Sequence, residues 1–522
     1  MASIKGHIKK GAMKKLLILL AIVMLHVTVN GQNTWSNNVA QIVYDNCSNC
    51  HNPNGIAPFK LLEYADAKPR AYGIRASVET GSMPPWIADT KYQSYAHERV
   101  LSTSEKAIIM DWVDKGSPEG DASKTPPPPV YGTKGFITQK PDLELKMPVY
   151  ASKATSTGDD YVCFSVPSGL MADKRIRGFE VIPGNHTIVH HALVYIDGTG
   201  SYPTDTTAGV CVGPTKGLIG GFVPGSPPTV FPTNGTDFNL GFTMKAGSNI
   251  VLAMHYPEGS LGLVDSTKIR FWFYDDGVNI REVTTSPLIE NWQFLLPANK
   301  ETNVNASRNI GNNDYSILSV FPHMHLLGSK IGSFAITNTN DTIPFVNIPH
   351  WDFEWQEFLF FKKIKKLPKG STIYGYGTYD NTTKNLHNPS NPPVLVRPGL
   401  NTTDEMFLIY FHYLPYQAGD ENQDIEAMTT LGIEFRPKIN IGVYPNPAQE
   451  QVSFDFASLN ANKVQLRVYD LHGKMIWENP AEVSNNTDRV TWQIPTALTS
   501  GVYFYSANVD GAMASGSFLI KR

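Results

Sequence analysis

Residues 136–437 consist of short β-rich runs interrupted by turn-forming residues, and this pattern limits the fold more than any other feature. The runs, separated by Gly, Pro, Asn and Asp, lie at 160–166, 177–182, 188–196, 249–255, 268–274, 315–321 and 405–414. Short strands bounded by such residues are typical of antiparallel sandwiches. A stretch of about 300 residues is enough for two of them. We therefore predict sandwiches at 136–286 and 287–437, with the seam near 287–291.

The region before these strands has the periodicity of a small α-helical domain. Apolar residues recur at helical spacing in 36–46, 70–79 and 104–115, Ser104 with Glu105 is a candidate cap for the last helix, and Gly116 ends it. Pro126 to Pro129 cannot continue a helix and favour a stiff, extended spacer. We predict a helical domain at 32–123 and a proline-rich linker at 124–135.

Composition and charge exclude some partners. The chain has 522 residues, of which 41% are hydrophobic, and its net charge is -3 with Lys and Arg scattered along it. Nothing in this distribution favours nucleic acid or an anionic membrane surface. We expect a multidomain monomer.

Residues 1–31 have the organisation of a signal peptide. Lys14 and Lys15 close a basic segment, an apolar run covers 16–29, and small residues precede Gln32. No later segment reaches the roughly 18 apolar residues of a membrane span. We expect a secreted or cell-surface protein, in which Cys163 and Cys211 form a disulfide because the oxidising exterior favours pairing of free thiols.

The motif Cys47-Ser-Asn-Cys50-His51 has the CxxCH spacing of c-type haem attachment. In this chemistry two thiols bond the haem and the neighbouring imidazole binds iron. A zinc site would need a further Cys or His pair, and a redox CxxC would not need the histidine. The motif therefore predicts one covalently bound haem c.

Two methionines are candidates for the second axial ligand. Met83 lies in a Met-Pro-Pro-Trp loop, whereas Met110 lies on the amphipathic helix at 104–115, where packing is the usual role. We favour Met83. Together the CxxCH motif, the turn at 55–58 and the Met-Pro-Pro-Trp loop resemble class I cytochrome c modules fused to bacterial oxidoreductases.

Histidines gather in three places within the two predicted sandwiches. They are His186, His190 and His191, then His255, and then the pair His323 and His325. Residues two apart on a strand face the same side, so His323 and His325 can bind one ion. His190 and His191 point to opposite faces of a regular strand, so this pair needs a bulge or twist and a third ligand, His255. A methionine such as Met406 would favour copper over zinc, because a thioether stabilises the cuprous state.

These motifs resemble, in order and spacing, the copper type II monooxygenases that include the peptidylglycine and dopamine β-hydroxylating enzymes. The matching segments are His190-His191, Met254-His255-Tyr256, 323–328 and 404–406. The resemblance implies two jelly-roll domains, an electron-transfer copper at His190, His191 and His255, and an oxygen-activating copper at His323, His325 and Met406. It also implies a disulfide between Cys163 and Cys211, and ascorbate as an external reductant.

Several positions depart from the amidating branch of that family. Phe321 and Leu408 stand where that branch has an arginine and an asparagine, so the clamp for a carboxylate substrate is missing. Tyr410 is retained as a catalytic candidate, and the segment 406–415 is more similar to the dopamine-hydroxylating branch. Phe407 stands at a usual cysteine position.

The remaining histidines and methionines receive simpler interpretations. His186 and His412 could each reach a copper, but supporting or surface roles are favoured. Packing is the expected role of two methionines, Met254 and Met324. Ordinary loop positions are expected for His97, His350 and His387.

The last 85 residues form a further predicted β-sandwich, of Ig-like type, at 438–522. Its strands are expected at 452–456, 464–470, 489–493 and 501–506. The motifs at 443–447, 468–474, 498–503 and 518–521 resemble the type IX secretion sorting domain of Bacteroidota, which implies the type IX machinery as a partner and excludes His472 as a metal ligand. The alternative is a sugar-binding sandwich that uses Trp477 and Trp492.

The motifs together predict a secreted monooxygenase that uses O₂ to hydroxylate an aliphatic or benzylic C–H bond of a small organic substrate. Electrons would come from the fused haem domain, held near the first copper domain by a linker that does not fix it rigidly. The alternatives are external ascorbate with a cytochrome that serves another partner, and a non-catalytic copper-binding electron-transfer protein. Oxygen uptake coupled to hydroxylation distinguishes an enzyme from a carrier.

Overall fold

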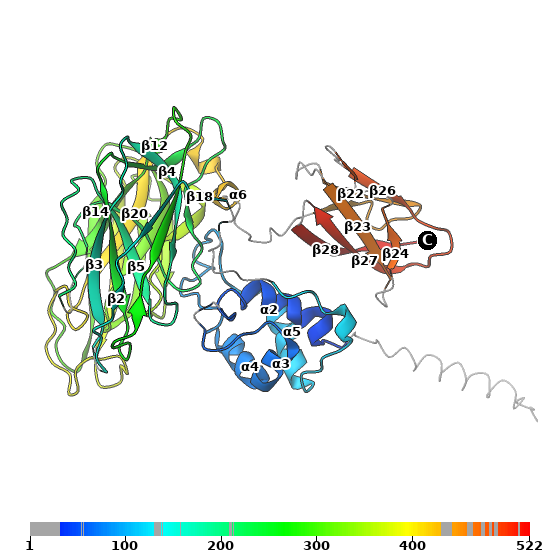
Figure 1. The fold of residues 1–522 in the computed structure, drawn as a ribbon, viewed down its shortest axis with the longest axis horizontal. Helices are drawn as coiled ribbons and strands as arrows, with labels where there is room; N and C mark the ends of the chain where they lie inside the picture. The colour runs from blue at the N-terminus through cyan, green and yellow to red at the C-terminus, as the bar shows by residue number, and fades with distance from the viewer. Residues whose placement is uncertain are drawn as a thin grey trace, which may run out of the picture. The chain divides into compact units, whose positions relative to one another are not determined.

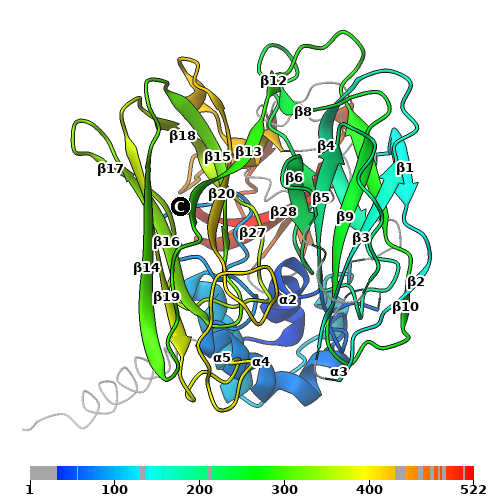
Figure 2. The ribbon, with the colours of Figure 1, turned by 90° about the vertical axis from the view of Figure 1, so that its left-hand side faces the viewer.

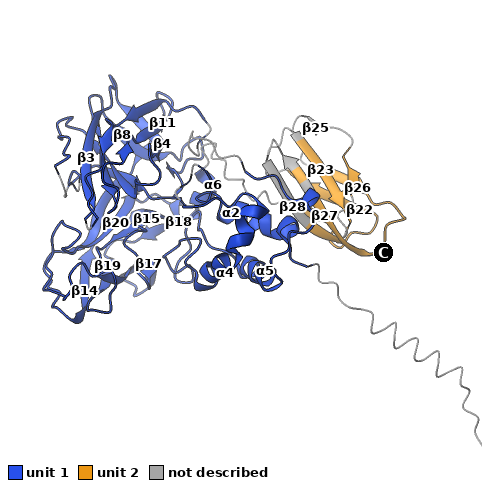
Figure 3. Ribbon diagram, turned by 60° about the horizontal axis from the view of Figure 1, so that its bottom comes forward, with its two compact units in different colours: residues 1–431 blue, residues 432–522 orange. Residues whose placement is uncertain are grey.

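A computed structural model of the chain describes residues 32–522 except 54, 56, 130–136, 138, 157, 208–210, 212, 430–440, 457–462, 471–474, 480–482, 485–488 and 510–511 (Figure 1). The predicted signal peptide, the second half of the proline-rich linker and the predicted boundary at 438 lie outside the described residues. The chain divides into two compact units, 1–431 and 432–522, which are coloured separately in Figure 3. The described part is mainly β, as expected.

The N-terminal module is helical. Its elements are η1 (Trp35–Val39), α2 (Ala40–Asn46), α3 (Tyr64–Ala67), η2 (Lys68–Arg70), α4 (Ala71–Thr80), α5 (Thr103–Asp114) and η3 (Ala122–Lys124). Trp35 and Trp112 are buried in its core. The cap of α5 is Ser102 and not Ser104, because the partners in a capping box lie three positions apart. The Ser102 hydroxyl accepts the Glu105 N–H, and the Glu105 carboxylate accepts the Ser102 N–H.

The first sandwich packs two sheets against each other, and their pairing is antiparallel except for the parallel pair of β12 with β8. One sheet has the order β1-β11-β4-β8-β12 with β7 beside β4, the other has the order β3-β9-β5-β6, and β2 pairs with β10. The strands are β1 (Leu143–Lys146), β2 (Tyr150–Ala151), β3 (Asp160–Pro167), β4 (Lys174–Ile182), β5 (His191–Asp197), β6 (Leu218–Phe222), β7 (Thr229–Val230), β8 (Leu240–Met244), β9 (Asn249–Tyr256), β10 (Val264–Asp265), β11 (Lys268–Phe273) and β12 (Arg281–Glu282). The predicted disulfide between Cys163 and Cys211 is confirmed.

The second sandwich pairs the sheet β13-β20-β15-β18 with the sheet β14-β19-β16-β17. Its elements are β13 (Thr284–Asn291), β14 (Lys300–Asn309), β15 (Tyr315–His323), β16 (Gly328–Ile336), β17 (Thr342–Ile348), β18 (Leu359–Leu367), β19 (Thr372–Asn381), β20 (Phe407–Pro415), η4 (Asp420–Asn422) and α6 (Ile425–Met428). Since β12 pairs with β8 of the first sandwich, the change of sandwich falls at Val283, before the predicted boundary at 287.

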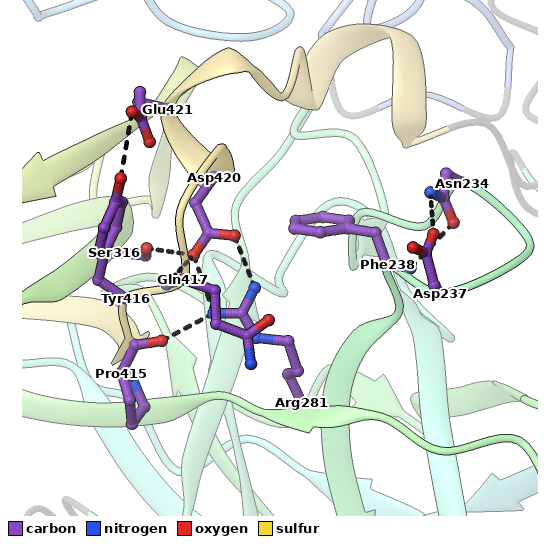
Figure 4. A network of polar contacts seen from close by, with 10 residues as sticks. All are labelled: Asn234, Asp237, Phe238, Arg281, Ser316, Pro415, Tyr416, Gln417, Asp420 and Glu421. Atoms are coloured by element: carbon purple, nitrogen blue, oxygen red, sulfur yellow. Dashed lines mark hydrogen bonds and ion pairs between the residues drawn. The ribbon is translucent and has the colours of Figure 1, made fainter.

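The two sandwiches, seen as two groups of strands in Figure 2, share buried contacts. The core of the first includes Leu318 and Leu414 from the second. The Arg281 guanidinium donates to both carboxylate oxygens of Asp420 at 2.6 and 2.8 Å and to the Pro415 carbonyl at 2.7 Å (Figure 4). A largely buried charged pair with this geometry fixes the orientation of the elements it joins.

The segment 86–99 of the helical module covers one edge of the second sandwich. β18 and β17 are the terminal strands of their sheets. The Ala96 N–H donates to the Phe360 carbonyl on β18, and the Tyr95 hydroxyl donates to the Phe345 carbonyl on β17. Covering open edges in this way removes sites of unwanted strand pairing. The module is therefore docked through buried contacts, which differs from the predicted loose tether.

Residues 432–522 form a separate small sandwich. Its sheets have the orders β21-β22-β26 and β24-β23-β27-β28, with β25 beside β23. The strands are β21 (Gly442–Tyr444), β22 (Gln451–Asp455), β23 (Lys463–Tyr469), β24 (Met475–Glu478), β25 (Val483–Ser484), β26 (Arg489–Gln493), β27 (Gly501–Val509) and β28 (Ala512–Ile520). Trp492 is 3% exposed and stacks on Trp477 within this core, so it is not available as a sugar platform.

Candidate metal centres

The structure brings His190, His191 and His255 together. In β5 and β9, His191 lies opposite His255, and the His190 N–H donates to the His255 carbonyl. One ligand nitrogen from each ring lies within 4.8 Å of the others. The predicted strand at 188–196 begins only at His191, so His190 precedes it and does not have to alternate away from its neighbour. This offset allows two adjacent histidines to face one ion.

Burial lowers the pKa of two of these imidazoles, His190 and His191. Desolvation lowers the pKa of His190 to about 3, and burial with the neighbouring histidines holds the pKa of His191 well below its usual value. A metal binds the neutral ring, so no proton has to be displaced near neutral pH.

Two residues that sequence reasoning missed support this first site. The Asp159 Oδ2 atom lies 3.2 Å from the His255 Nε2 atom, and the Tyr161 ring stacks on His255 with centroids 4.3 Å apart. The available signal was the position of both residues at the start of β3, which pairs with β9. A carboxylate and an aromatic ring beside a ligand histidine fix its orientation.

The second predicted site lies where β15 and β20 meet. His323 ends β15 opposite Leu408 of β20, and the His325 N–H donates to the Glu405 carboxylate, next to Met406 in the chain. The rings of His323 and His325 are 5.1 Å apart, and Met406 is 6% exposed. Its backbone carbonyl accepts the Tyr379 hydroxyl. The three predicted ligands therefore come from adjacent ends of two paired strands.

Neighbouring oxygens orient both rings of the second site. The His323 Nδ1 atom lies 2.5 Å from the Gln356 side-chain oxygen, and the His325 Nδ1 atom lies 3.1 Å from the Asp404 carbonyl. Because a carbonyl oxygen can only accept, each Nδ1 donates and each Nε2 keeps its lone pair for a metal. Burial lowers the pKa of His323 to about 3 and of His325 to about 4.

Glu405, which the sequence did not single out, holds the backbone of this site by hydrogen bonds. Its carboxylate is fully buried and accepts the backbone N–H groups of His325 at 2.9 Å and Leu327 at 2.6 Å. Burial raises the pKa of Glu405 to about 8, and these N–H groups oppose the shift. The residue before Met406 is thus bonded to the backbone of His325, which ties two predicted ligands together.

The loop between β17 and β18 reaches both histidine sets. The Phe353 ring lies 6.3 Å from the His255 ring and 5.9 Å from the His325 ring. From the same loop, Trp351 donates to the His325 carbonyl and Gln356 contacts His323. One segment therefore supports two sites that belong to different sandwiches.

Two apolar side chains, Phe321 and Leu408, occupy the positions expected for the carboxylate clamp. Phe321 stacks on Phe358 with centroids 4.7 Å apart and lies 5.9 Å from Tyr410. The His323 ring lies 6.3 Å from Phe321. Burial raises the pKa of Tyr410, so its phenol stays protonated. The surroundings of His323 are apolar on this side.

The CxxCH residues lie in a compact turn. The His51 N–H donates to the Cys47 carbonyl, and both Cys47 and Cys50 are unpaired thiols. The His51 Nδ1 atom lies 3.0 Å from the Phe59 carbonyl, so Nδ1 donates and the lone pair of Nε2 is left free. Met83 is 41% exposed in its loop, whereas Met110 lies on α5.

The other predicted roles have mixed outcomes. His412 is fully buried, bonds Ser319 through Nδ1 and faces the Ile219 carbonyl of the first sandwich, so its role is structural and not at the surface. Met254 and Met324 pack in the two cores, as predicted. His97 bonds Thr429 as a satisfied loop histidine. His186 is not part of the first histidine cluster.

Two family models match the chain. Residues 269–428 match the copper type II ascorbate-dependent monooxygenase, C-terminal domain, and residues 442–521 match the secretion system C-terminal sorting domain. Within the described residues no helix has the length and apolar character needed to cross a bilayer.

Similarity to solved structures is slight. The PorZ surface component of the type IX secretion system of Porphyromonas gingivalis is 16% identical, with 22% of this chain and 15% of that chain covered and a TM-score of 0.14. The FN1–FN3 domains of chicken CNTN1 are 10% identical, with 73% and 100% covered and a TM-score of 0.13. The family matches carry the assignment: this secreted or cell-surface chain contains a copper type II ascorbate-dependent monooxygenase C-terminal domain at 269–428 and a type IX sorting domain at 442–521.

Proposed function

We propose that the protein is a copper monooxygenase with two copper sites, one formed by His190, His191 and His255 and the other by His323, His325 and Met406. The observation that carries the proposal is the convergence of three imidazoles, with one nitrogen of each within 4.8 Å of the others, in a chain whose residues 269–428 match the copper type II monooxygenase C-terminal domain. Three imidazoles suit copper, and the thioether of Met406 adds a soft ligand at the second site.

Copper bound at these sites would supply one-electron redox chemistry and a place for O₂ to react. The protein prepares each ligand for this role. Gln356 and Asp404 hold the two rings of the second site with Nε2 free, while Glu405 fixes the backbone of His325 beside Met406. Such outer partners maintain the ligand geometry while the metal changes charge.

The substrate is a small organic molecule whose binding does not depend on a carboxylate group. Phe321, Phe358 and Leu408 present apolar surface near His323, and the Tyr410 phenol is the polar group that these rings adjoin. Apolar surroundings with one phenol favour an aliphatic or benzylic C–H bond as the position that is hydroxylated.

The helical module carries one haem c that supplies electrons. Cys47 and Cys50 provide two unpaired thiols, and the bond from His51 to the Phe59 carbonyl leaves Nε2 free for iron. The thioether of Met83 would be the second protein ligand of the iron. Hydroxylation consumes two electrons, and a covalently attached one-electron carrier keeps the immediate electron donor at high effective concentration beside the copper domain.

Oxygen uptake by the copper-loaded full chain, measured with product analysis by mass spectrometry across a panel of apolar substrates, tests the activity. His323→Ala should abolish product formation, whereas His350→Ala, at an exposed loop position, should leave it unchanged. Copper binding without oxygen consumption by the wild-type protein would instead identify a copper carrier.

A further inference from the structure

The thiol of Cys50 lies against a tight turn of the first sandwich. A Cβ atom added at Gly225 would lie 2.5 Å from the Cys50 Sγ atom, so only a residue without a side chain allows this contact. Gly225 also has a φ of +78°, which favours glycine independently. The CxxCH motif therefore touches the backbone of a domain that holds a proposed copper site.

Hydrogen bonds hold this turn rigidly. The Ser226 N–H and hydroxyl both donate to the Val223 carbonyl, at 3.0 and 2.7 Å, and the Val223 N–H donates to the Ser226 hydroxyl at 3.2 Å. Val223 is 1% exposed and Ser226 is 8% exposed. Hydrogen bonds run in both directions between Val223 and Ser226, so the backbone surface that contacts Cys50 has a fixed conformation.

The turn leads directly to the first histidine set. It follows β6, which ends at Phe222, and Phe222 pairs with Ala192 on β5. Ala192 is the residue after His191. A short run of covalent bonds and one strand pairing therefore joins the surface under Cys50 to a proposed copper ligand.

Buried contacts hold the helical module in this position. Arg99 forms a bidentate ion pair with Glu357, of which one bond is 3.1 Å, and the two side chains are 19% and 13% exposed. The Asp89 N–H donates to the Asn347 carbonyl and the Ala96 N–H to the Phe360 carbonyl, both at 2.8 Å. The contact between Cys50 and Gly225 is thus one part of an extended interface.

We propose that the contact between Cys50 and Gly225 is the point at which electrons leave the haem and enter the first copper domain. This inference rests on the proposed haem and copper sites. In each transfer one electron leaves ferrous haem, which becomes ferric, and reduces cupric copper bound by His190, His191 and His255 to the cuprous form. No bond is made or broken, and an external one-electron donor such as ascorbate then reduces the haem again.

Gly225→Ala tests this inference, with Gly247→Ala as its matched control. Gly247 has a φ of +74° and, among the described residues, no atom within 4 Å of an added Cβ, so it carries the same backbone strain without the sulfur contact. In the copper-loaded full chain under nitrogen, flash reduction of the haem is followed by its reoxidation, read from the haem absorption. We expect Gly225→Ala to slow reoxidation about tenfold, the effect of losing about 1.4 kcal/mol of docking, and Gly247→Ala to leave it unchanged.

A second measurement does not depend on turnover. In copper-free protein, hydrogen exchange at the Asp89 and Ala96 amides should be faster in Gly225→Ala than in the control, because an added Cβ pushes the module from its surface. Tyr95→Ala, which loosens the interface elsewhere, should also slow reoxidation.

The possible failures are distinguishable. Absence of covalent haem from the wild-type protein, measured as the pyridine haemochrome, would refute the haem proposal and this inference with it. Haem in the wild-type protein together with equal reoxidation rates in Gly225→Ala and Gly247→Ala would overturn the electron route alone.

Discussion

Replacing Tyr95 measures how firmly the helical module is docked. Its side chain is 2% exposed, its hydroxyl donates to the Phe345 carbonyl at 2.9 Å, and its ring stacks on Phe361 with centroids 5.9 Å apart. Tyr95→Phe keeps the ring and removes only the donor, which leaves a buried carbonyl unpaired at a cost of about 1–2 kcal/mol. Tyr95→Ala also removes the ring and should cost about 3–5 kcal/mol.

Hydrogen exchange at the amides of Asp89 and Ala96 is the suitable assay, because both donate across the interface. A loss of one or two kcal/mol corresponds to a factor of roughly 5–30 in the population of the open form. Tyr95→Phe should therefore accelerate exchange at these amides by that factor, and Tyr95→Ala should accelerate it further. Tyr72→Phe is the control, since Tyr72 is 81% exposed on α4. If exchange in Tyr95→Ala equals that of the wild type, the docked interface is refuted.

Four further outcomes follow from the sites and the tail. Met406→Leu should abolish turnover while about one copper stays bound, measured by metal analysis. Asp159→Asn should weaken copper binding at the first site about 10–100-fold, measured by titration. Copper-free protein should lose stability as pH falls from 6.5 toward 4, because burial lowers the pKa of His325 to about 4 and the unfolded chain then takes up more protons, measured by denaturant unfolding. Intact mass of the secreted protein should show the removal of residues beyond roughly 438, as sorting tails are cleaved.

Local sequence pattern predicted the strands, because alternation and turn residues act within a few positions. It also showed which histidines lie on or beside those strands. The runs at 249–255 and 315–321 correspond to β9 and β15, and His255 and His323 lie at or near their ends. The family resemblance then grouped histidines that are far apart in sequence. Strand register supplied what the pattern could not, since it places His191 opposite His255.

Long-range contacts made by loops were not predictable from the sequence. Gln356 and Phe353 lie in a segment without periodicity, so nothing in the sequence indicated that they reach His323 and His255. The segment 86–99 gave a similar result: Tyr95 and Ala96 form no apolar repeat, yet both are buried against the sandwiches. The loose tether was inferred from the proline run, whereas the position of the helical module depends on these buried residues.

The loop between β17 and β18 contacts both proposed copper sites and the helical module that is proposed to carry haem. Gln356 orients His323, Phe353 lies beside both histidine sets, and Glu357 binds Arg99 of the helical module. A displacement of this loop would alter the second copper site and the docking of the haem module together, because the residues that serve them are consecutive or nearly so. We therefore expect the docking of the helical module and the geometry of the proposed second copper site to be linked. A variant such as Glu357→Gln, which contacts no metal ligand, should weaken both hydrogen-exchange protection at Ala96 and copper affinity at the second site, whereas an effect on protection alone would show that the loop transmits nothing.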